Sequence, residues 1–400
     1  MSVTFPRGFR AAGVTAGMKP SGHPDLGMLV ADAPCGAAAL FTTNAFAAWP
    51  VRIGRERLAG GTAQAVLVNS GQANAGTGPD GRTDALAATA AAAVLLGTEP
   101  ELVLPSSTGV IGERLHIEEL TAALPALVRS LTAEAEGGDA FAHAIMTTDT
   151  VDKQALAERG GYRVGGCAKG VGMISPNLAT MLAFVTTDAP VPPAAVHELA
   201  TTVLEEPFES LSVDACTSTN DTVLLLASGA AGGDPVVPGS VAWHELAVAV
   251  AEVGESLLSQ LAHDAEGVTH VLLIDVEGAA NTADARAAAR AIVDSPLVKA
   301  AAFGGDPNPG RLLQAVGSSG VPFDPALVQA WIGEISVIEG GHIARTYFDP
   351  GSGTRAAATV AMEAPEIRIR LSLGQGAGRS RAVGCDLSYD YVRINGEYTT

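Results

Sequence analysis

The segment KGVGMISPNLATML, residues 169–182, contains the residue on which the interpretation of the whole chain depends. That residue is Thr180, which follows Ala179 and precedes the apolar run MLAFVTTDA, residues 181–189. The run predicts a buried strand, so a threonine at its start would be held in a fixed place. If the chain is cut before this threonine, its hydroxyl becomes a nucleophile that has its own α-amine as a base. The alternative is an ordinary structural threonine at the start of a core strand.

Short apolar strands alternate with alanine-rich helices on both sides of this segment. Apolar runs predict strands at residues 63–69, 101–105, 181–187, 222–227, 268–276, 367–373 and 392–395. Alanine-rich runs and apolar residues at helical spacing predict helices at residues 85–96, 117–131, 193–205, 241–261 and 283–293. The order is mixed and does not repeat a βαβ unit, so the sequence predicts an α/β protein without a low-complexity linker.

The composition bounds the size and the partners of the protein. Its 400 residues are 47% hydrophobic, which is enough for one large or two ordinary globular domains. The formal net charge of −19, with no basic cluster, argues against nucleic acid as a partner. The longest apolar segment, residues 85–97, is too short to span a bilayer, and the first residues lack the apolar region of a signal peptide. We therefore expect a cytoplasmic protein that does not bind membranes.

The spacing of cysteine and histidine residues predicts no metal site. The scattered Cys35, Cys167, Cys216 and Cys385 form no Cys-x-x-Cys pair and are expected to be buried small side chains. The histidines do not cluster, and no His-Glu-x-x-His motif is present. A P-loop lysine motif is also lacking. We therefore expect neither a metal nor an organic cofactor.

Motifs along nearly the whole chain resemble, in order, those of the ornithine acetyltransferase (bifunctional glutamate N-acetyltransferase) family of arginine biosynthesis. The segment around Thr180 resembles the self-cleaving threonine of that family. The other motifs are NSGQANAGTG (69–78), SSTGVIG (106–112), IMTTDT (145–150), TSTNDT (217–222), HDAEG (263–267), SPLVK (295–299), GDPNPGR (305–311) and GCDLSYDYVRINGEYTT (384–400).

The resemblance implies a self-processed acyltransferase with a threonine nucleophile. A cut between Ala179 and Thr180 would give an α chain of residues 1–179 and a β chain of residues 180–400. The two pieces would form one intertwined catalytic unit with helices packed over mixed β-sheets, and two such pairs would form a heterotetramer. The implied reaction moves an acetyl group from N2-acetyl-L-ornithine to Thr180 and then to L-glutamate, without a metal or an organic cofactor.

The chemistry of the nucleophile needs a base and an oxyanion site. The free α-amine of Thr180 would have a pKa of about 7.7–8.0, so it could accept the hydroxyl proton near neutral pH. SSTGVIG is predicted to follow the strand at residues 101–105, and the resemblance implies the Thr108 hydroxyl and the Gly109 amide as oxyanion donors. The alternative is a turn in which Ser and Thr cap the next helix.

Binding of two amino-acid substrates in turn needs charged and hydroxyl groups. The resemblance implies Thr147, Lys169, Thr180, Glu266, Asn395 and Thr400 for this role. Glycines around Lys169 predict a tight turn, and the alternatives for Lys169, Thr147 and Glu266 are a solvated lysine, a turn around Asp149 and a helix-end carboxylate. A chain end is commonly frayed, so a role for Thr400 requires that the C-terminal tail docks.

Some motifs depart from the family pattern. Ala215 and Cys216 stand where a glycine and an aspartate are usual, and Pro309 stands where tryptophan is common. Gly76 replaces a common cysteine, and Ala265 replaces a usual glycine. These departures leave the predicted catalytic residues intact but bear on the pocket and the substrate range.

Three alternatives to simple acetyl exchange remain open from the sequence. A bifunctional enzyme would also use acetyl-CoA to acetylate glutamate, which depends on access for a large thioester. A self-processing aminopeptidase or amidase would pass the acyl group to water, but the match along the whole chain favours transfer. A catalytically inactive binding protein is disfavoured by the intact pair of Ala179 and Thr180.

Overall fold

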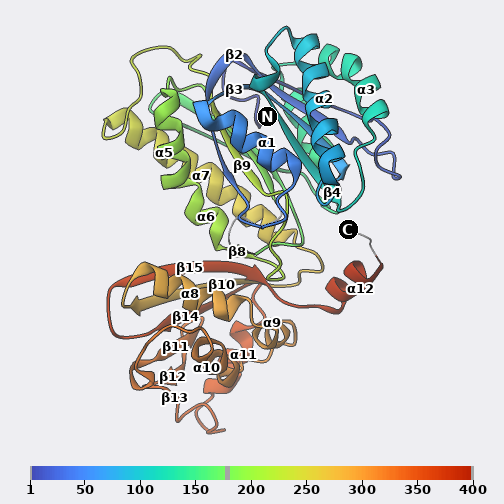
Figure 1. The fold of residues 1–400 in the computed structure, drawn as a ribbon. Coiled ribbons are helices and arrows are strands. Elements are labelled where there is room, and N and C mark those ends of the chain that lie inside the picture. The colour runs from blue at the N-terminus through green and yellow to red at the C-terminus, as the bar shows by residue number, and fades with distance from the viewer. Residues whose placement is uncertain (1, 176–180, 398–400) are drawn as a thin grey trace. The chain divides into compact units, whose positions relative to one another are not determined.

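The computed structural model describes residues 2–175 and 181–397, and the chain forms two compact units. The first unit comprises Met1–Glu209 and Cys216–Leu261, and the second comprises Ser210–Ala215 and Ala262–Thr399. Each unit contains one mixed β-sheet with helices packed against it (Figure 1). This confirms the predicted α/β class with helices over mixed sheets.

The sheet of the first unit has eight strands in the order β4-β3-β2-β9-β7-β6-β5, and β1 pairs with β2. Its strands are β1 (Phe9–Val14), β2 (Leu26–Phe41), β3 (Thr62–Gln72), β4 (Val103–Val110), β5 (Lys153–Arg159), β6 (Tyr162–Lys169), β7 (Leu182–Thr187) and β9 (Thr222–Ala227). Every residue of β7 and β9 is buried, which explains why both are continuous apolar runs. The pairs β3–β4 and β7–β9 are parallel, and the other pairs are antiparallel.

Helices of the first unit bury the sheet in two separate cores. The helices are α1 (Trp49–Arg57), α2 (Gly78–Leu96), α3 (Ile117–Arg129), α4 (Ala135–Ile145), α5 (Pro193–Val203), α6 (Glu205–Ser210) and α7 (Val241–His263). One core places Phe141 of α4 edge-on against Phe184 of β7, with ring centroids 5.2 Å apart. The other lies under α2 and α3, which contact each other (Figure 1). Helix α2 ends at Gly97, whose φ of 70° is the left-handed conformation of a helix C-cap.

The second unit has a seven-stranded sheet in the order β13-β12-β11-β14-β10-β15-β8. Its strands are β8 (Leu211–Ser212), β10 (Val271–Ala279), β11 (Gln329–Ile332), β12 (Ile335–Glu339), β13 (His342–Ile343), β14 (Glu366–Ser372) and β15 (Gly378–Cys385). Its helices are α8 (Thr282–Val293), α9 (Pro296–Phe303), α10 (Pro309–Gly317), α11 (Thr354–Ala361) and α12 (Tyr389–Glu397). Asn281, Ser295 and Asn308 cap α8, α9 and α10 through their side-chain oxygens.

The predicted cut before Thr180 falls inside the first unit and not between the two units. Strand β6 lies before that point and β7 lies after it, yet the two pair antiparallel from Lys169 with Leu182 to Val164 with Thr187. Both predicted pieces therefore contribute neighbouring strands to one sheet. The cut itself stays a prediction.

Most predicted helices and strands are confirmed, but three local predictions differ from the structure. The predicted strand at residues 392–395 is wrong, because these residues lie in helix α12. SSTGVIG does not simply follow a strand, since residues 106–110 belong to β4 itself. Lys169 is the last residue of β6, so Gly165 and Gly166 lie in a strand and not in a tight turn.

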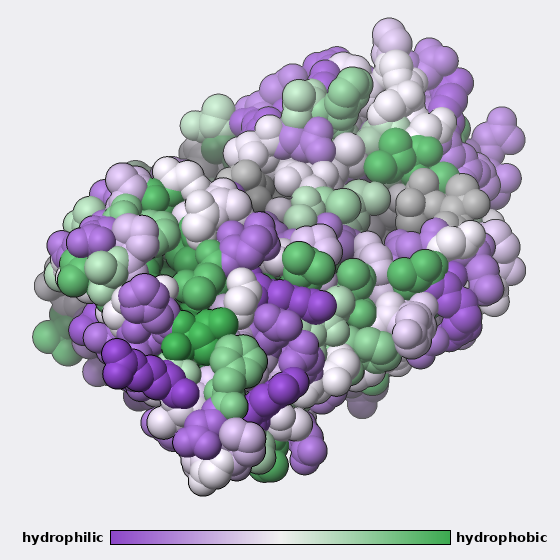
Figure 2. All heavy atoms as spheres, turned by 90° about the horizontal axis from the view of Figure 1, so that it is seen from below, coloured by the Kyte–Doolittle hydropathy of each residue, from purple (hydrophilic) through white to green (hydrophobic). Residues whose placement is uncertain are grey.

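The cysteines and the large hydrophobic side chains differ in their exposure to solvent. Three cysteines are buried as expected, whereas Cys216 is exposed. Within the described ranges, no helix is long and apolar enough to cross a membrane. Hydrophilic and hydrophobic residues are interspersed over the face drawn in Figure 2. Exposed large hydrophobic side chains of the second unit include Phe348, Val360 and Tyr389.

Candidate functional site

Thr108 and Gly109 lie near the end of β4, where this strand runs parallel to β3. Ser70 pairs with Thr108, and Gly71 pairs with Gly109. The Thr108 side chain is inside the protein, since the residue is only 4% exposed. The predicted oxyanion donors are therefore held within a strand ladder, whereas the sequence placed them after the strand.

The backbone at this point requires glycine. Gly109 has a φ of 130°, and Gly71 beside it has a φ of 135°. A Cβ atom on Gly109 would lie 2.2 Å from the carbonyl carbon and oxygen of Gly71. Any larger residue at position 109 would force the two strands apart, so the glycine in the SSTGVIG motif has a steric cause.

Lys169 reaches from the end of β6 to two of the other predicted site residues. Its Nζ donates a hydrogen bond to Thr147 Oγ1 at 2.6 Å and lies 3.4 Å from Thr108 Oγ1. The side chain is 3% exposed, so the alternative of a solvated surface lysine is wrong. The structure thus brings together Thr108, Thr147 and Lys169, which come from three separate parts of the sequence.

Asp149 compensates the buried positive charge of this cluster. Its Oδ2 atom lies 3.8 Å from Lys169 Nζ, and its Oδ1 atom lies 2.8 Å from Lys153 Nζ. The backbone amides of Thr147 and Gly170 donate to the same carboxylate at 3.0 and 2.7 Å. Burial alone would raise the pKa of Asp149, but Lys169, Lys153 and the Thr147 amide lower it to about 2. The carboxylate is therefore ionised at neutral pH.

A further lysine was not recognised from the sequence. Lys19 Nζ donates to the carbonyl of Met146 at 2.6 Å and to the carbonyl of Pro24 at 2.7 Å. Burial lowers the pKa of Lys19 to about 8, with Asp25 acting in the opposite direction and Lys169 adding to the decrease. Since Met146 precedes Thr147, Lys19 supports the segment that presents the Thr147 hydroxyl. No sequence signal marks it, because its partners are carbonyl groups.

This cluster can bind an anion and orient a carbonyl group. Three lysine ammonium groups lie near the carboxylates of Asp149 and Asp25; they belong to Lys153, Lys169 and Lys19. The Lys169 ammonium and the Thr147 hydroxyl together suit an amino-acid carboxylate, which accepts several hydrogen bonds. Thr108 stands next to Lys169 as a hydroxyl donor.

The second unit brings together two other predicted residues. Asn395, in helix α12, donates from Nδ2 to Glu266 Oε2 at 2.8 Å. Glu266 lies in the turn that follows α7 and is half-buried. The two residues are 129 positions apart in the sequence, so their contact is a product of the fold. A carboxylate and an amide side by side suit a substrate ammonium group.

Ala179, Thr180 and Thr400 lie outside the described residues, so the cleavage site, the nucleophile and the C-terminal contact stay predictions. The nearest described neighbour of the nucleophile is Met181, whose amide donates to Asp221 Oδ1 at 3.1 Å.

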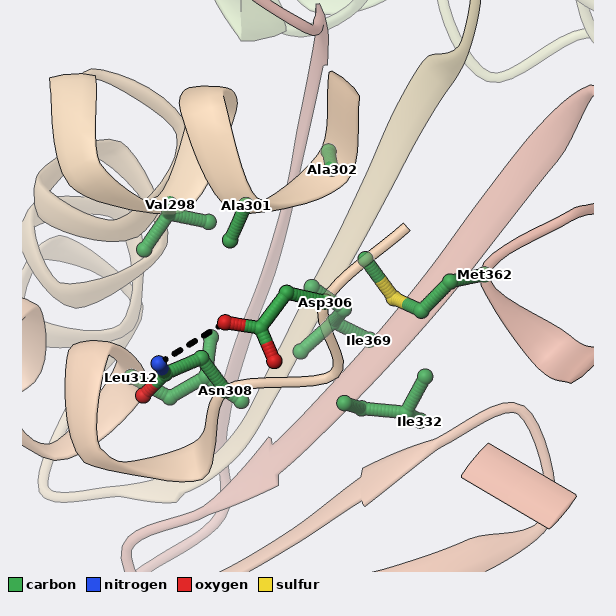
Figure 3. A pocket seen from close by; sticks show the side chains of 9 residues that line it. All are labelled: Val298, Ala301, Ala302, Asp306, Asn308, Leu312, Ile332, Met362 and Ile369. Carbon is green, nitrogen blue, oxygen red and sulfur yellow. Dashed lines mark hydrogen bonds between the residues drawn. The ribbon is translucent and has the colours of Figure 1, made fainter. Parts of the chain in front are cut away.

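A small pocket in the second unit contains none of the predicted site residues. Figure 3 shows Asp306 and Asn308 facing each other there, with Asn308 Nδ2 donating to Asp306 Oδ2 at 3.0 Å. The rest of its lining is apolar: Val298, Ala301, Ala302, Leu312, Ile332, Met362 and Ile369. This pair belongs to the GDPNPGR motif, and Asn308 also caps α10, so the motif has a structural role.

Comparisons with known proteins match the chain as a whole. The model of the ArgJ family matches residues 10–400. The arginine biosynthesis bifunctional protein ArgJ of Thermosynechococcus vestitus is 45% identical over all of this chain and 98% of its own length. That of Thermus thermophilus is 46% identical over 100% of both chains. The crystal structure of arginine biosynthesis bifunctional protein ArgJ from Bacillus halodurans is 36% identical, with a TM-score of 0.50, covering 54% of this chain and 98% of that one.

Proposed function

This chain belongs to the ArgJ family, and we propose that it transfers an acetyl group from N2-acetyl-L-ornithine to L-glutamate through an acetyl-Thr180 intermediate. The step serves arginine biosynthesis, the pathway in the names of the relatives. The observation that carries the proposal is the buried cluster of Thr108, Thr147 and Lys169, which combines a hydroxyl donor with a site for a substrate carboxylate.

The first half-reaction breaks the amide bond of the donor. Thr180 Oγ attacks the acetyl carbonyl carbon while the α-amine of Thr180 accepts the hydroxyl proton. The negative charge that forms on the carbonyl oxygen is stabilised by the Thr108 hydroxyl and the Gly109 amide. The bond to the ornithine nitrogen then breaks, and that nitrogen receives the proton from the Thr180 amine. Ornithine leaves, and the acetyl group stays as an ester on Thr180.

The second half-reaction reverses the sequence with another amine. The amino group of glutamate attacks the ester carbonyl and loses a proton to the Thr180 amine. The same donors stabilise the oxyanion, and Thr180 Oγ leaves with that proton. Thr147 and Lys169 therefore hold the carboxylate of each substrate in turn. The resemblance implies Glu266, Asn395 and Thr400 as further substrate contacts.

Maturation by self-cleavage is part of the proposal. The Thr180 hydroxyl attacks the Ala179 carbonyl, the acyl group moves from nitrogen to oxygen, and water hydrolyses the ester. Support comes from the pairing of β6 with β7, because the two pieces would stay together in one sheet after the cut.

The other parts of the proposal concern cofactors, location and assembly. The reaction as written needs neither a metal nor an organic cofactor, because Thr180 supplies both nucleophile and base. We place it in the cytoplasm, as an assembly of two α and two β chains. Size-exclusion chromatography with light scattering tests the assembly, and a mass of one α–β pair would contradict it.

A second candidate activity is acetylation of glutamate by acetyl-CoA. The relatives from Thermosynechococcus vestitus and Thermus thermophilus are named bifunctional, which favours it. Release of free CoA from acetyl-CoA in the presence of glutamate tests this activity without any acetylornithine. A lack of release, with acetylornithine active, would leave only the exchange reaction.

The experiment that tests the main proposal follows both products. Ornithine release from N2-acetyl-L-ornithine is measured with and without glutamate, together with the formation of N-acetylglutamate. We expect sustained release only with glutamate, and parallel double-reciprocal lines at several fixed glutamate concentrations. Release that continues without glutamate would instead indicate a hydrolase.

A further inference from the structure

Asp221 occupies the point where three strands of the first unit meet. It directly precedes β9, and the Thr222 amide donates to the carbonyl of Met181 at the start of β7. The Thr42 amide, just after β2, donates to the carbonyl of Asp221 itself. Backbone pairing therefore fixes Asp221 beside Met181, the residue that follows the proposed nucleophile in the sequence.

The Asp221 carboxyl group is buried, and one of its two oxygens accepts a hydrogen bond from the described residues. The residue is 0% exposed, and Oδ1 accepts the Met181 amide at 3.1 Å. Among residues 2–175 and 181–397, Oδ2 has no hydrogen-bond partner. Buried carboxyl oxygens are nearly always paired in folded proteins, so an unpaired one calls for an explanation.

Asn220, the residue before Asp221, contacts the strand that carries Thr108. Its Nδ2 donates to the carbonyl of Ser107 at 2.8 Å and to the carbonyl of Ala73 at 2.6 Å. Ser107 directly precedes Thr108 on β4. Two adjacent side chains therefore contact two different segments. Asn220 contacts the one that precedes the predicted oxyanion donors, and Asp221 contacts the one that follows the predicted nucleophile in the sequence.

We propose that Asn220 and Asp221 form a positioning pair that fixes Ser107, which precedes the predicted oxyanion donors, relative to Met181, which follows the predicted nucleophile in the sequence. The inference rests on the proposed function, since it gives the TSTNDT motif a role in the same reaction. Both residues act through the backbone, at Ser107 and Met181, and not by contact with substrate. Small displacements of reacting groups cost large factors in rate, so such a pair affects turnover more than substrate binding.

The electrostatics favour a neutral carboxyl group in this role. Burial raises the pKa of Asp221 well above its usual range, and this effect outweighs the opposing effects of the Met181 amide and the Lys169 charge. A neutral carboxyl group offers one acceptor and one donor, as an asparagine amide does. The Asp221→Asn variant should therefore keep the role of the carboxyl group, whereas the Asp221→Ala variant should lose it.

The test uses the full chain in four variants: Asp221→Ala, Asp221→Asn, Asn220→Ala and, as control, Asp188→Ala. Asp188 is a matched control because it is also 0% exposed and lies just past the other end of β7. It accepts from Arg7 and from the backbone amide of Arg163, which lies near the start of β6, whereas Lys169 ends that strand. For each variant we measure the melting temperature, the fraction cleaved before residue 180, kcat per folded molecule and KM for both substrates.

We expect Asp221→Ala and Asn220→Ala to lower kcat by about 100-fold, with slower cleavage and little change in either KM. Asp221→Asn should restore most of kcat, and Asp188→Ala should lose stability but keep kcat. The inference is overturned if Asp221→Ala turns over like Asp188→Ala, or if Asp221→Asn is as impaired as Asp221→Ala. If Asp221→Ala does not fold, Asn220→Ala with unchanged kcat overturns it. A wild-type protein that transfers no acetyl group would instead refute the proposed function.

Discussion

The Lys169 ammonium and the Thr147 hydroxyl form a 2.6 Å hydrogen bond between the end of β6 and the segment after α4. The pair is supported from both sides. Asp149 lies 3.8 Å from the ammonium group, and Lys19 donates to the carbonyl of Met146, next to Thr147. Both groups can donate hydrogen bonds. A substrate carboxylate can therefore accept one from the Lys169 ammonium and one from the Thr147 hydroxyl.

Removal of the Thr147 hydroxyl should weaken binding of both substrates. A hydrogen bond to a charged group contributes about 1.5–3 kcal/mol, so Thr147→Val should raise KM for acetylornithine and glutamate by about 10- to 100-fold. Thr147→Ser keeps the hydroxyl and is the control. Steady-state kinetics with each substrate varied checks the prediction. A change in kcat alone would assign Thr147 to another role.

Removal of the Thr108 hydroxyl should slow turnover and leave binding intact. Loss of one oxyanion donor typically costs a factor of about 10²–10³ in kcat, which is the effect expected for Thr108→Ala. Thr108→Ser should retain most of the activity because it keeps the donor. If both variants turn over like the wild type, Thr108 is not an oxyanion donor.

The low pKa of Asp149 predicts an acid-dependent loss of stability. The folded pKa of about 2 lies below the ordinary value of 3.8, so the folded state binds its proton less readily than the unfolded chain. The resulting stabilisation is present above pH 3.8 and is lost as pH falls through about 2. Urea unfolding at several pH values, compared with Asp149→Asn, measures it. The difference between the two proteins should shrink as pH falls below about 4, and a constant difference would contradict the assignment.

Ala215 adopts a backbone conformation that suits glycine. Its φ is 58°, in the left-handed region, where an L-residue with a Cβ atom is strained by roughly 1–2 kcal/mol. The resemblance led us to note a usual glycine at this position. Ala215→Gly should therefore stabilise the protein by up to about 1 kcal/mol after the entropic cost of glycine in the unfolded chain. Denaturant unfolding checks this, and a decrease in stability would show that the strain is relieved elsewhere.

The helices and strands were predictable where the pattern of apolar residues is uninterrupted, and were missed where other residues interrupt that pattern. The buried strands β7 and β9 and the long helix α7 were recognised from their apolar runs. Strand β2, which lies between β3 and β9 in the interior of the first sheet, was missed because Asp32, Pro34 and Gly36 break its pattern. The structure accommodates these residues with a register shift between Val30 and Cys35.

The site shows a similar division. Resemblance predicted Thr108, Thr147 and Lys169, and the fold brings them together. The burial of Lys169 could not be predicted from its neighbours in sequence, because it depends on partners from β4 and from the segment after α4. The contribution of Lys19 and Asp221 was missed for the same reason, since their contacts are with backbone groups that any residue could supply.

The central claim is that the acetyl group rests on Thr180 between the two half-reactions. Mass spectrometry of purified protein incubated with N2-acetyl-L-ornithine alone tests it most directly. We predict a fragment that begins Thr-Met-Leu-Ala, carries one added acetyl group on its first residue, and loses that group when glutamate is added. An uncut chain, or a cut chain that releases ornithine in the presence of glutamate without ever carrying the acetyl group, would contradict the account.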